Sequence, residues 1–216
     1  MSIALSIGNN LTTNGVFTSS AVNNTSVNNV TDFASVPGGA VLKLLSTQTA
    51  SASATLSFTS GIDDTYDSYV FKFYDIHPAT DNTRFQFNLS TDSGSNYNVT
   101  KTTTDFRAQH AEDDSSSVLE YDAAYDLAQS TSDQPLNDSG NDNDQALSGS
   151  MTLFSPSSTT FVKHFIAQVD GSRWNDLQQI YYVAGYGNTT SAVDAIRFQM
   201  SSGNIDSGII KMYGVV

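Results

Sequence analysis

The stretch RFQFNL, residues 84–89, alternates between polar and apolar side chains, with its two phenylalanines and its leucine at every second position. Because successive side chains of a β-strand point to opposite faces, this alternation predicts an antiparallel strand with one face on a core and the other toward solvent. The stretch IRFQM, residues 196–200, alternates in the same way. Both stretches indicate a sheet protein rather than a helical one.

Further runs of β-branched, aromatic and aliphatic residues extend this pattern along the chain, and clusters of Gly, Asp, Asn, Ser and Pro separate them. We expect the remaining strands at residues 41–47, 54–58, 69–76, 97–103, 151–154, 161–169, 180–184 and 209–216. A spacing of about ten residues between short strands is typical of a sandwich or barrel. The sequence therefore predicts an all-β fold: an antiparallel two-sheet, jelly-roll-like β-sandwich with an extended N-terminal arm.

The segment SSGNIDSGIIKMYGVV, residues 201–216, contains the last predicted strand. We expect residues 204–208 to form the turn before it. The residues after the turn are apolar at nearly every position, as in a strand covered on both faces or packed between the core and a neighbouring chain. With the last strand buried in this way, attachment to a larger object is expected through the N-terminal region.

Residues 1–40 differ from the rest of the chain, because Asp32 is their one charged side chain and polar triplets recur in them. Such a segment is either a flexible linker or an arm that docks on a partner through main-chain hydrogen bonds. The pair Gly38-Gly39 marks its end. We therefore divide the chain into an extended polar arm, residues 1–40, and a β-sandwich domain, residues 41–216.

Residues 104–147 interrupt the strand pattern and carry 11 of the 22 acidic residues against one basic residue, Arg107. We expect this range to form a long acidic excursion from the sandwich, with a short helix near residues 123–129. Loops of this length are commonly functional or disordered.

The chain has 9 Lys and Arg residues against 22 Asp and Glu residues, which gives a formal charge of −13. An anionic surface repels phosphate, so we expect neither nucleic acid nor an acidic membrane as a partner.

The absence of Cys excludes disulfides and a Cys nucleophile. We find no signal-peptide pattern and no apolar stretch of the about 20 residues that a membrane span needs. We expect synthesis in the cytoplasm, no membrane insertion and, if the protein works outside a cell, release by lysis or inside a particle.

The segment NDSGNDNDQ, residues 137–145, is the densest group of oxygen ligands in the sequence. Asp138, Asp142 and Asp144 are candidate ligands for Ca²⁺, the one cofactor that the sequence suggests. Their spacing departs from the EF-hand pattern, which requires a Gly and a bidentate Glu in register. The alternative is a solvated acidic turn that binds no cation.

Trp174 lies in a polar turn, and Tyr181 and Tyr186 follow in and near the next predicted strand. An exposed aromatic ring that stacks on a sugar, beside Asp and Asn hydrogen-bonding groups, is a common feature of lectins. These three residues are candidate contacts for a sugar. The alternative is that Trp174 folds back and caps the core.

Catalytic signals are weak, and we predict no catalytic residue. The segment STDSGSNY, residues 90–97, resembles an Asp box, which is a structural hairpin in propeller proteins. Glu120 and Asp122 have the spacing of two carboxylates on one face of a strand, as a glycosidase needs, but chance produces such pairs in so acidic a region. The three histidines lie far apart, outside any metal-ligand spacing.

Four segments carry a resemblance that extends over residues 35–216: GGAVLKLLSTQTASASATLSFTS, YVFKFYDIHPATDNTRFQFNLSTDSGSNYNVTKTTT, LFSPSSTTFVKHFIAQV and AGYGNTTSAVDAIRFQMSSGNIDSGIIKMYGVV. In this order they resemble a group of largely uncharacterised virion proteins of marine tailed phages. The resemblance implies a β-sandwich on the outside of the particle, as a tail-fibre domain or a head decoration. Phage surface domains of this type are often trimers, and the last strand would suit a subunit contact.

We therefore expect a structural, non-enzymatic protein of the virion surface, either a short tail fibre or a capsid decoration. Residues 1–40 would dock on other virion proteins, and the sandwich would face host glycans or neighbouring subunits in a homo-oligomer. The alternative is a free carbohydrate-binding or carbohydrate-cleaving protein, with an open cleft at Trp174 or near Glu120.

Overall fold

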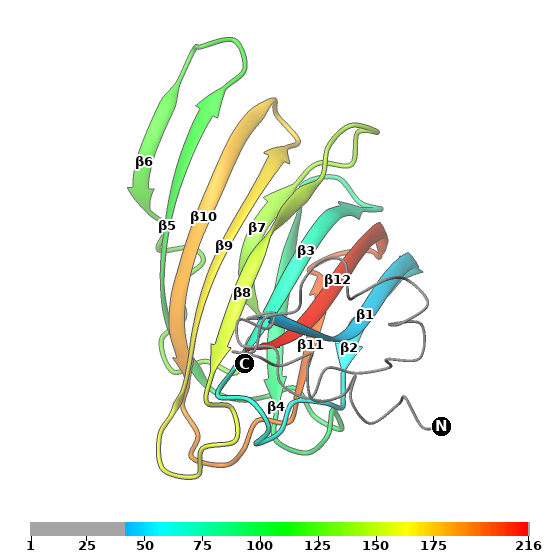
Figure 1. Cartoon of the computed structure of the whole chain (residues 1–216). Coiled ribbons are helices and arrows are strands. Elements are labelled where there is room, and N and C mark those ends of the chain that lie inside the picture. Colours follow the sequence, from blue (N-terminus) through cyan, green and yellow to red (C-terminus); the bar gives the residue numbers. More distant parts are fainter. Residues whose placement is uncertain (1–41, 216) are drawn as a thin grey trace, which may run out of the picture. The chain divides into compact units, whose positions relative to one another are not determined.

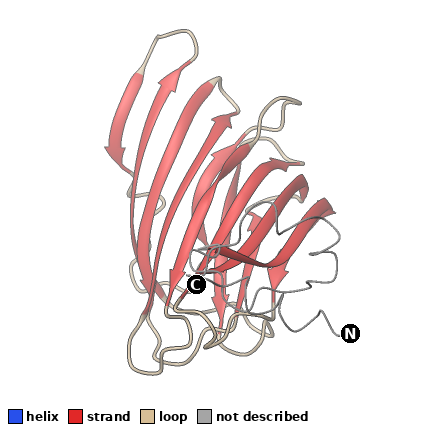
Figure 2. Ribbon diagram, in the orientation of Figure 1, coloured by secondary structure: helices blue, strands red, loops and turns tan. Residues whose placement is uncertain are grey.

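A computed structural model describes residues 42–215, and within this range the fold consists of strands, turns and loops, with no helix (Figure 2). The strands are β1 (Leu42–Ser53), β2 (Leu56–Phe58), β3 (Ser68–Pro78), β4 (Thr83–Ser90), β5 (Lys101–Ala111), β6 (Ser117–Tyr121), β7 (Gln134–Ser139), β8 (Leu147–Phe154), β9 (Lys163–Arg173), β10 (Leu177–Gly187), β11 (Ala195–Met200) and β12 (Ile205–Val215). The described part of the chain thus has no helix that could cross a membrane. The predicted N-terminal arm, residues 1–40, lies outside the described residues.

The strands form two antiparallel sheets whose order matches a jelly roll. The eight-stranded sheet has the order β1-β12-β3-β8-β9-β10-β5-β6, and the four-stranded sheet has the order β2-β11-β4-β7 (Figure 1). Four nested pairs underlie both sheets: β1 with β12, β2 with β11, β3 with β8, and β4 with β7. In a jelly roll, a long ribbon of paired strands folds over on itself, and this folding produces nested pairs of this kind. The predicted all-β, jelly-roll-like sandwich is therefore confirmed.

Two additional hairpin-like pairs widen the large sheet. The pair β5–β6 is inserted between β4 and β7, and the pair β9–β10 is inserted between β8 and β11. Both join the same edge of the large sheet, because β9 pairs with β8 and β10 pairs with β5. The large sheet is therefore twice as wide as the small one, and its β8–β6 half presents a broad outer face.

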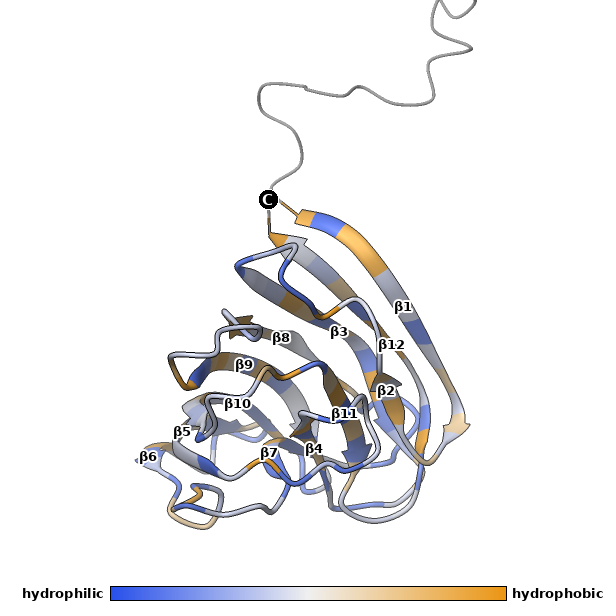
Figure 3. Ribbon diagram, turned by 90° about the horizontal axis from the view of Figure 1, so that it is seen from below, coloured by the Kyte–Doolittle hydropathy of each residue, from blue (hydrophilic) through white to orange (hydrophobic). Residues whose placement is uncertain are grey.

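The apolar core lies between the two sheets and is centred on Phe198 of β11, which is fully buried. Its ring lies within 5.2–6.3 Å, centroid to centroid, of five other phenylalanines: Phe58, Phe71, Phe73, Phe85 and Phe87. Hydrophobic and hydrophilic residues form bands along the strands (Figure 3). In β4 and β11 the buried phenylalanines alternate with less buried polar residues, as the period-two pattern of residues 84–89 and 196–200 predicts.

The last strand, β12, lies inside the large sheet between β1 and β3, so a strand at the end of the sequence is confirmed. The predicted turn at residues 204–208 is wrong, because β12 already begins at Ile205. Gly208 instead occupies an irregularity in the pairing of β12 with β3, with a φ of 124°. A Cβ at this position would lie 2.7 Å from the carbonyl oxygen of Asp75, so glycine allows the close approach.

The predicted acidic excursion, residues 104–147, is wrong over much of its length, because the range contains most of β5 and all of β6 and β7. Residues 123–129, the predicted helix, form turns and bends instead. The strand predicted at residues 97–103 begins only at Lys101.

Strand β7, QPLNDS, is buried throughout, although only one of its residues is aliphatic. Its polar side chains belong to a second, polar part of the interior, which is described below.

The segment resembling an Asp box, residues 90–97, connects the two sheets rather than forming a hairpin, because β4 and β5 lie in different sheets. Asp92 holds the loop together. Its Oδ1 accepts hydrogen bonds from the Ser90 hydroxyl at 2.7 Å and from the backbone N–H of Asn96 at 2.8 Å. These bonds lower the pKa of Asp92, and the Asn96 contacts contribute most. The role of the segment is structural.

Candidate functional site

The outer face of the β8–β6 half of the large sheet is the main exposed apolar surface, and we call it the aromatic face. It consists of the even-numbered residues of β5, β8, β9 and β10 and the odd-numbered residues of β6, because these positions alternate with inward side chains. Five of the nine exposed large hydrophobic residues among residues 42–215 lie on it: Phe106, Leu119, Tyr121, Phe154 and Ile166. The hydrophobic effect favours covering such a patch.

Strand register places three aromatic rings side by side across the aromatic face. Tyr182 of β10 is opposite Phe106 of β5, which in turn is opposite Tyr121 of β6. The rings of Tyr182 and Phe106 stack with centroids 4.9 Å apart and planes 6° apart. The Tyr121 hydroxyl donates a 2.6 Å hydrogen bond to Asp126. This row is therefore preorganised, and little side-chain entropy remains to be lost when a partner covers it.

A shallow groove of about 460 Å³ lies on the aromatic face next to this row. Small residues of β10, Ala184 and Gly185, lie between Ile166 of β9 and the threonines of β5, and Phe154 of β8 lines the groove beyond β9. Tyr186 closes one end, where its ring packs edge-on against His164 at 5.9 Å. The lining is mostly apolar, with threonines of β5 as the polar groups. Such a groove suits a flat, uncharged group.

Charge distinguishes the aromatic face from the rest of the sheet. Among its positions in the described strands, Asp170 is the only Asp, Glu, Lys or Arg. In the other half of the same sheet, outward tyrosines are covered by lysines. The Lys72 ammonium lies 5.9 Å from the ring centroid of Tyr213, and the Lys211 ammonium lies 5.3 Å from that of Tyr74. The aromatic face lacks this cationic cover.

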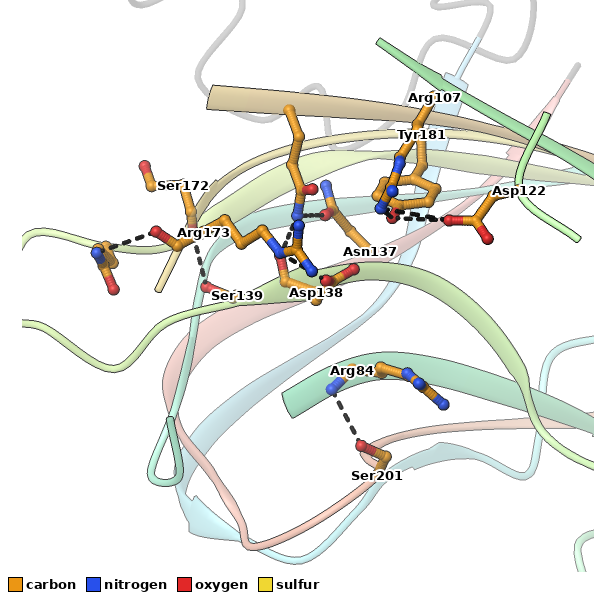
Figure 4. A network of polar contacts seen from close by, with 12 residues as sticks. Arg84, Arg107, Asp122, Asn137, Asp138, Ser139, Ser172, Arg173, Tyr181 and Ser201 are labelled. Atoms are coloured by element: carbon orange, nitrogen blue, oxygen red, sulfur yellow. Dashed lines mark hydrogen bonds and ion pairs between the residues drawn. The ribbon is translucent and has the colours of Figure 1, made fainter. Parts of the chain in front are cut away.

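Beneath the aromatic face, the inner side of β5 and β10 meets β7 and the segment after β6 in a polar layer that we call the polar core (Figure 4). The Arg107 guanidinium donates a 2.7 Å hydrogen bond to the Tyr181 hydroxyl and lies 3.3 Å from a carboxylate oxygen of Asp122. On β7, Asp138 forms a 3.0 Å ion pair with Arg173. Buried polar groups paired in this way fix side-chain positions.

Amide side chains complete the polar core on β7 and β10. Gln179 donates 2.7 Å hydrogen bonds to the Asn137 side chain and to the Asp138 carbonyl, and Asn137 donates to the Val169 carbonyl at 2.9 Å. These bonds tie the small sheet to the large one. They also explain why the polar sequence of β7 is buried, since its polar side chains have partners inside the protein.

Asp105, on the inner face of β5, is the residue of the polar core whose side chain has no partner at all in the described part of the chain, whereas Asp138 and Gln179 each leave only one buried side-chain oxygen without a partner. It is fully buried, and among residues 42–215 neither of its carboxylate oxygens has a hydrogen-bond partner. Burial, together with the charge of Asp122, raises the pKa of Asp105 to about 8, while Arg107 opposes the shift. A carboxyl group in this position holds its proton at neutral pH.

The three predicted sugar contacts are not brought together. Tyr181 is fully buried and stacks on Tyr125 at 5.4 Å, so its prediction as an exterior ligand contact is wrong. Trp174 lies in the turn between β9 and β10 and is 41% exposed, so its predicted cap on the core is not formed. Tyr186 lies at the other end of β10, in the groove. Of the three, Tyr186 belongs to the aromatic face.

The three predicted Ca²⁺ ligands also do not form one site. Asp138 is buried and paired with Arg173, whereas Asp142 and Asp144 are exposed in the loop between β7 and β8. Within residues 42–215, no three His, Cys, Asp or Glu side chains form a group that could hold a metal ion. Glu120 and Asp122 likewise do not flank a cleft, because both pair with the same guanidinium, that of Arg107.

Apart from Tyr186, sequence reasoning missed the residues that make up the aromatic face. A period of two was visible in the sequence of β5, where Thr104, Phe106 and Ala108 alternate with Asp105 and Arg107. The apolar set of such a strand is expected to face the core, yet here the polar set does. No protein-family model, curated protein or solved structure matches the chain.

Proposed function

We propose that the chain is a structural, non-enzymatic protein of the surface of a tailed-phage virion, either a short tail fibre or a capsid decoration. Residues 1–40 would dock on other virion proteins, and the sandwich would face outward. The observation that carries this proposal is the nested pairing of the jelly roll, an architecture used by viral capsid domains and by lectins. The resemblance of residues 35–216 to phage virion proteins supports the same role.

The interior supports a binding or structural role rather than catalysis. The carboxylates that a glycosidase would use are held by an arginine, with Glu120 2.7 Å and Asp122 3.3 Å from Arg107. Asp105 is buried beneath the sheet. The broad exposed surface is apolar and poor in charge, as expected of a surface that packs against another molecule.

Deletion of residues 1–37 tests the docking role of the arm. We expect the shortened chain to fold, because the two sheets are built from residues 42–215. In cells producing the phage, it should be absent from purified particles while the full chain is incorporated. Circular dichroism of the purified chain provides the folding control. Incorporation of the folded, shortened chain at the level of the full chain would contradict the role of the arm.

The second candidate is a free carbohydrate-binding protein, and the groove beside Tyr186 favours it. A neutral sugar could lay its apolar face on the rings while the threonines of β5 supply hydroxyls. We expect Tyr186→Ala to abolish binding to host polysaccharide and Trp174→Ala to leave it unchanged, as measured by calorimetry. Release of sugars from that polysaccharide, with or without Ca²⁺, would indicate a carbohydrate-cleaving enzyme instead.

A further inference from the structure

The aromatic face is the part of the described surface where a second acidic molecule meets the least repulsion. The chain carries a formal charge of −13, so two copies repel each other over most orientations. Among the aromatic-face positions of the described strands, Asp170 is the one Asp, Glu, Lys or Arg residue, and the face also carries two histidines, His110 and His164. Two copies that meet there bring together Asp170 and, from the segment after β6, Asp126, whose carboxylate accepts the Tyr121 hydroxyl, but few other carboxylates.

The size of the aromatic face fits a stable contact. It covers five neighbouring strands, β8, β9, β10, β5 and β6. With strands about 4.8 Å apart and about nine residues long at about 3.4 Å per residue, its footprint is about 700 Å². A standard specific interface buries about 800 Å² on each partner. A glycan in the groove would cover only part of this area and would leave the row from Tyr182 to Tyr121 exposed.

The composition of the aromatic face also matches an interface core. Tyr and Phe are enriched in such cores, and charged residues are depleted. The stacked rings of Phe106 and Tyr182 and the bonded hydroxyl of Tyr121 are fixed before any partner arrives. Because an identical copy presents the same uncharged rows, the surface is complementary to itself, as a two-fold contact requires.

We propose that the aromatic face is a homotypic interface, through which one copy of the chain packs face to face against the same face of a second copy. This goes beyond the proposed virion role, which does not specify the surface that joins subunits. It also differs from the expected trimer, because a face-to-face pair is closed and has no place for a third copy.

Sedimentation equilibrium of the full-length chain over a wide range of protein concentration tests this interface. We expect a monomer–dimer equilibrium that shifts toward dimer at high salt, because salt screens the repulsion between two copies of charge −13. Ile166→Asp on the aromatic face should raise the dimer dissociation constant by about 100-fold or more, since each dimer would bury two unpaired carboxylates.

Leu44→Asp is the matched control, because Leu44 is 51% exposed and Ile166 is 56% exposed, and Leu44 lies on β1 at the opposite edge of the same sheet. It should leave the dimer intact. Phe106→Asp, a second variant on the aromatic face, should act like Ile166→Asp, and near-ultraviolet circular dichroism of each variant verifies the fold.

Three results would overturn the proposal: a monomer at all concentrations, a trimer, or equal effects of Ile166→Asp and Leu44→Asp. The purified chain alone is measured, so failure of the interface is distinguishable from failure of the virion role, which is tested in particles.

Discussion

Asp105 links a single buried side chain to the pH dependence of the whole fold. Four charged groups perturb it: Asp122 and Asp126 from the segment after β6, Arg107 from its own strand, and Asp138 from β7. Burial raises its folded-state pKa from 3.8 to about 8. The unfolded chain releases this proton near pH 4, whereas the folded chain keeps it, so rising pH between these values favours unfolding.

Asp105→Asn should therefore stabilise the protein at pH 8 by about 2 kcal/mol, since one pKa unit corresponds to about 1.4 kcal/mol and a polarisable interior reduces the full effect. Urea unfolding at a series of pH values measures this. The difference between the variant and the wild type should be small near pH 4 and should grow as the pH rises to about 8. Asp206→Asn, at an exposed position of β12, is the control and should show no such trend. Equal pH profiles for wild type and Asp105→Asn would contradict the assignment.

At the scale of elements, the strands with a regular apolar pattern were predictable and the polar strands were not. β4 and β11 follow the expected period of two. β3 and β12 also alternate in burial, although β12 was expected to be apolar at nearly every position, and Ile209 and Tyr213 on its outer side are only partly buried. β7 was missed because its buried side chains are mainly polar and are satisfied by hydrogen bonds between the sheets. β6 was missed because it is a mostly exposed edge strand paired only with β5. Hydrophobic periodicity reports burial in an apolar core, to which β7 contributes only Leu136 and β6 contributes no residue.

The positions of β12 and β6 predict opposite effects of their removal. Deletion of residues 209–216 should abolish folding, because β12 pairs with both β1 and β3 and contributes Ile210 and Met212 to the core. Replacement of residues 117–121 by a short Gly-Ser turn should leave a folded chain, since β6 pairs on one side only. Near-ultraviolet circular dichroism and cooperative urea unfolding distinguish the two outcomes. A cooperative transition after loss of residues 209–216 would show that β12 is dispensable.

For the whole molecule, fold class and two-sheet architecture followed from strand spacing, but the sheet order did not. The pairing of β1 with β12, or of β5 with β10, joins segments that are far apart in sequence, and local patterns do not encode such partners. For the same reason, the sequence could not show that β5–β6 and β9–β10 extend one sheet. The aromatic face exists only because of that extension, which brings Ile166, Tyr182 and Phe106 onto one surface.

The central claim is that this chain is exposed on a virion, and immunogold electron microscopy of intact particles tests it most directly. Antibodies raised against the recombinant sandwich domain would be applied to purified particles of the proposed source phage. We expect gold on the particles, on the tail for a fibre or over the head for a decoration. Unlabelled particles from a lysate that contains the protein would contradict the account and would favour a free carbohydrate-binding protein.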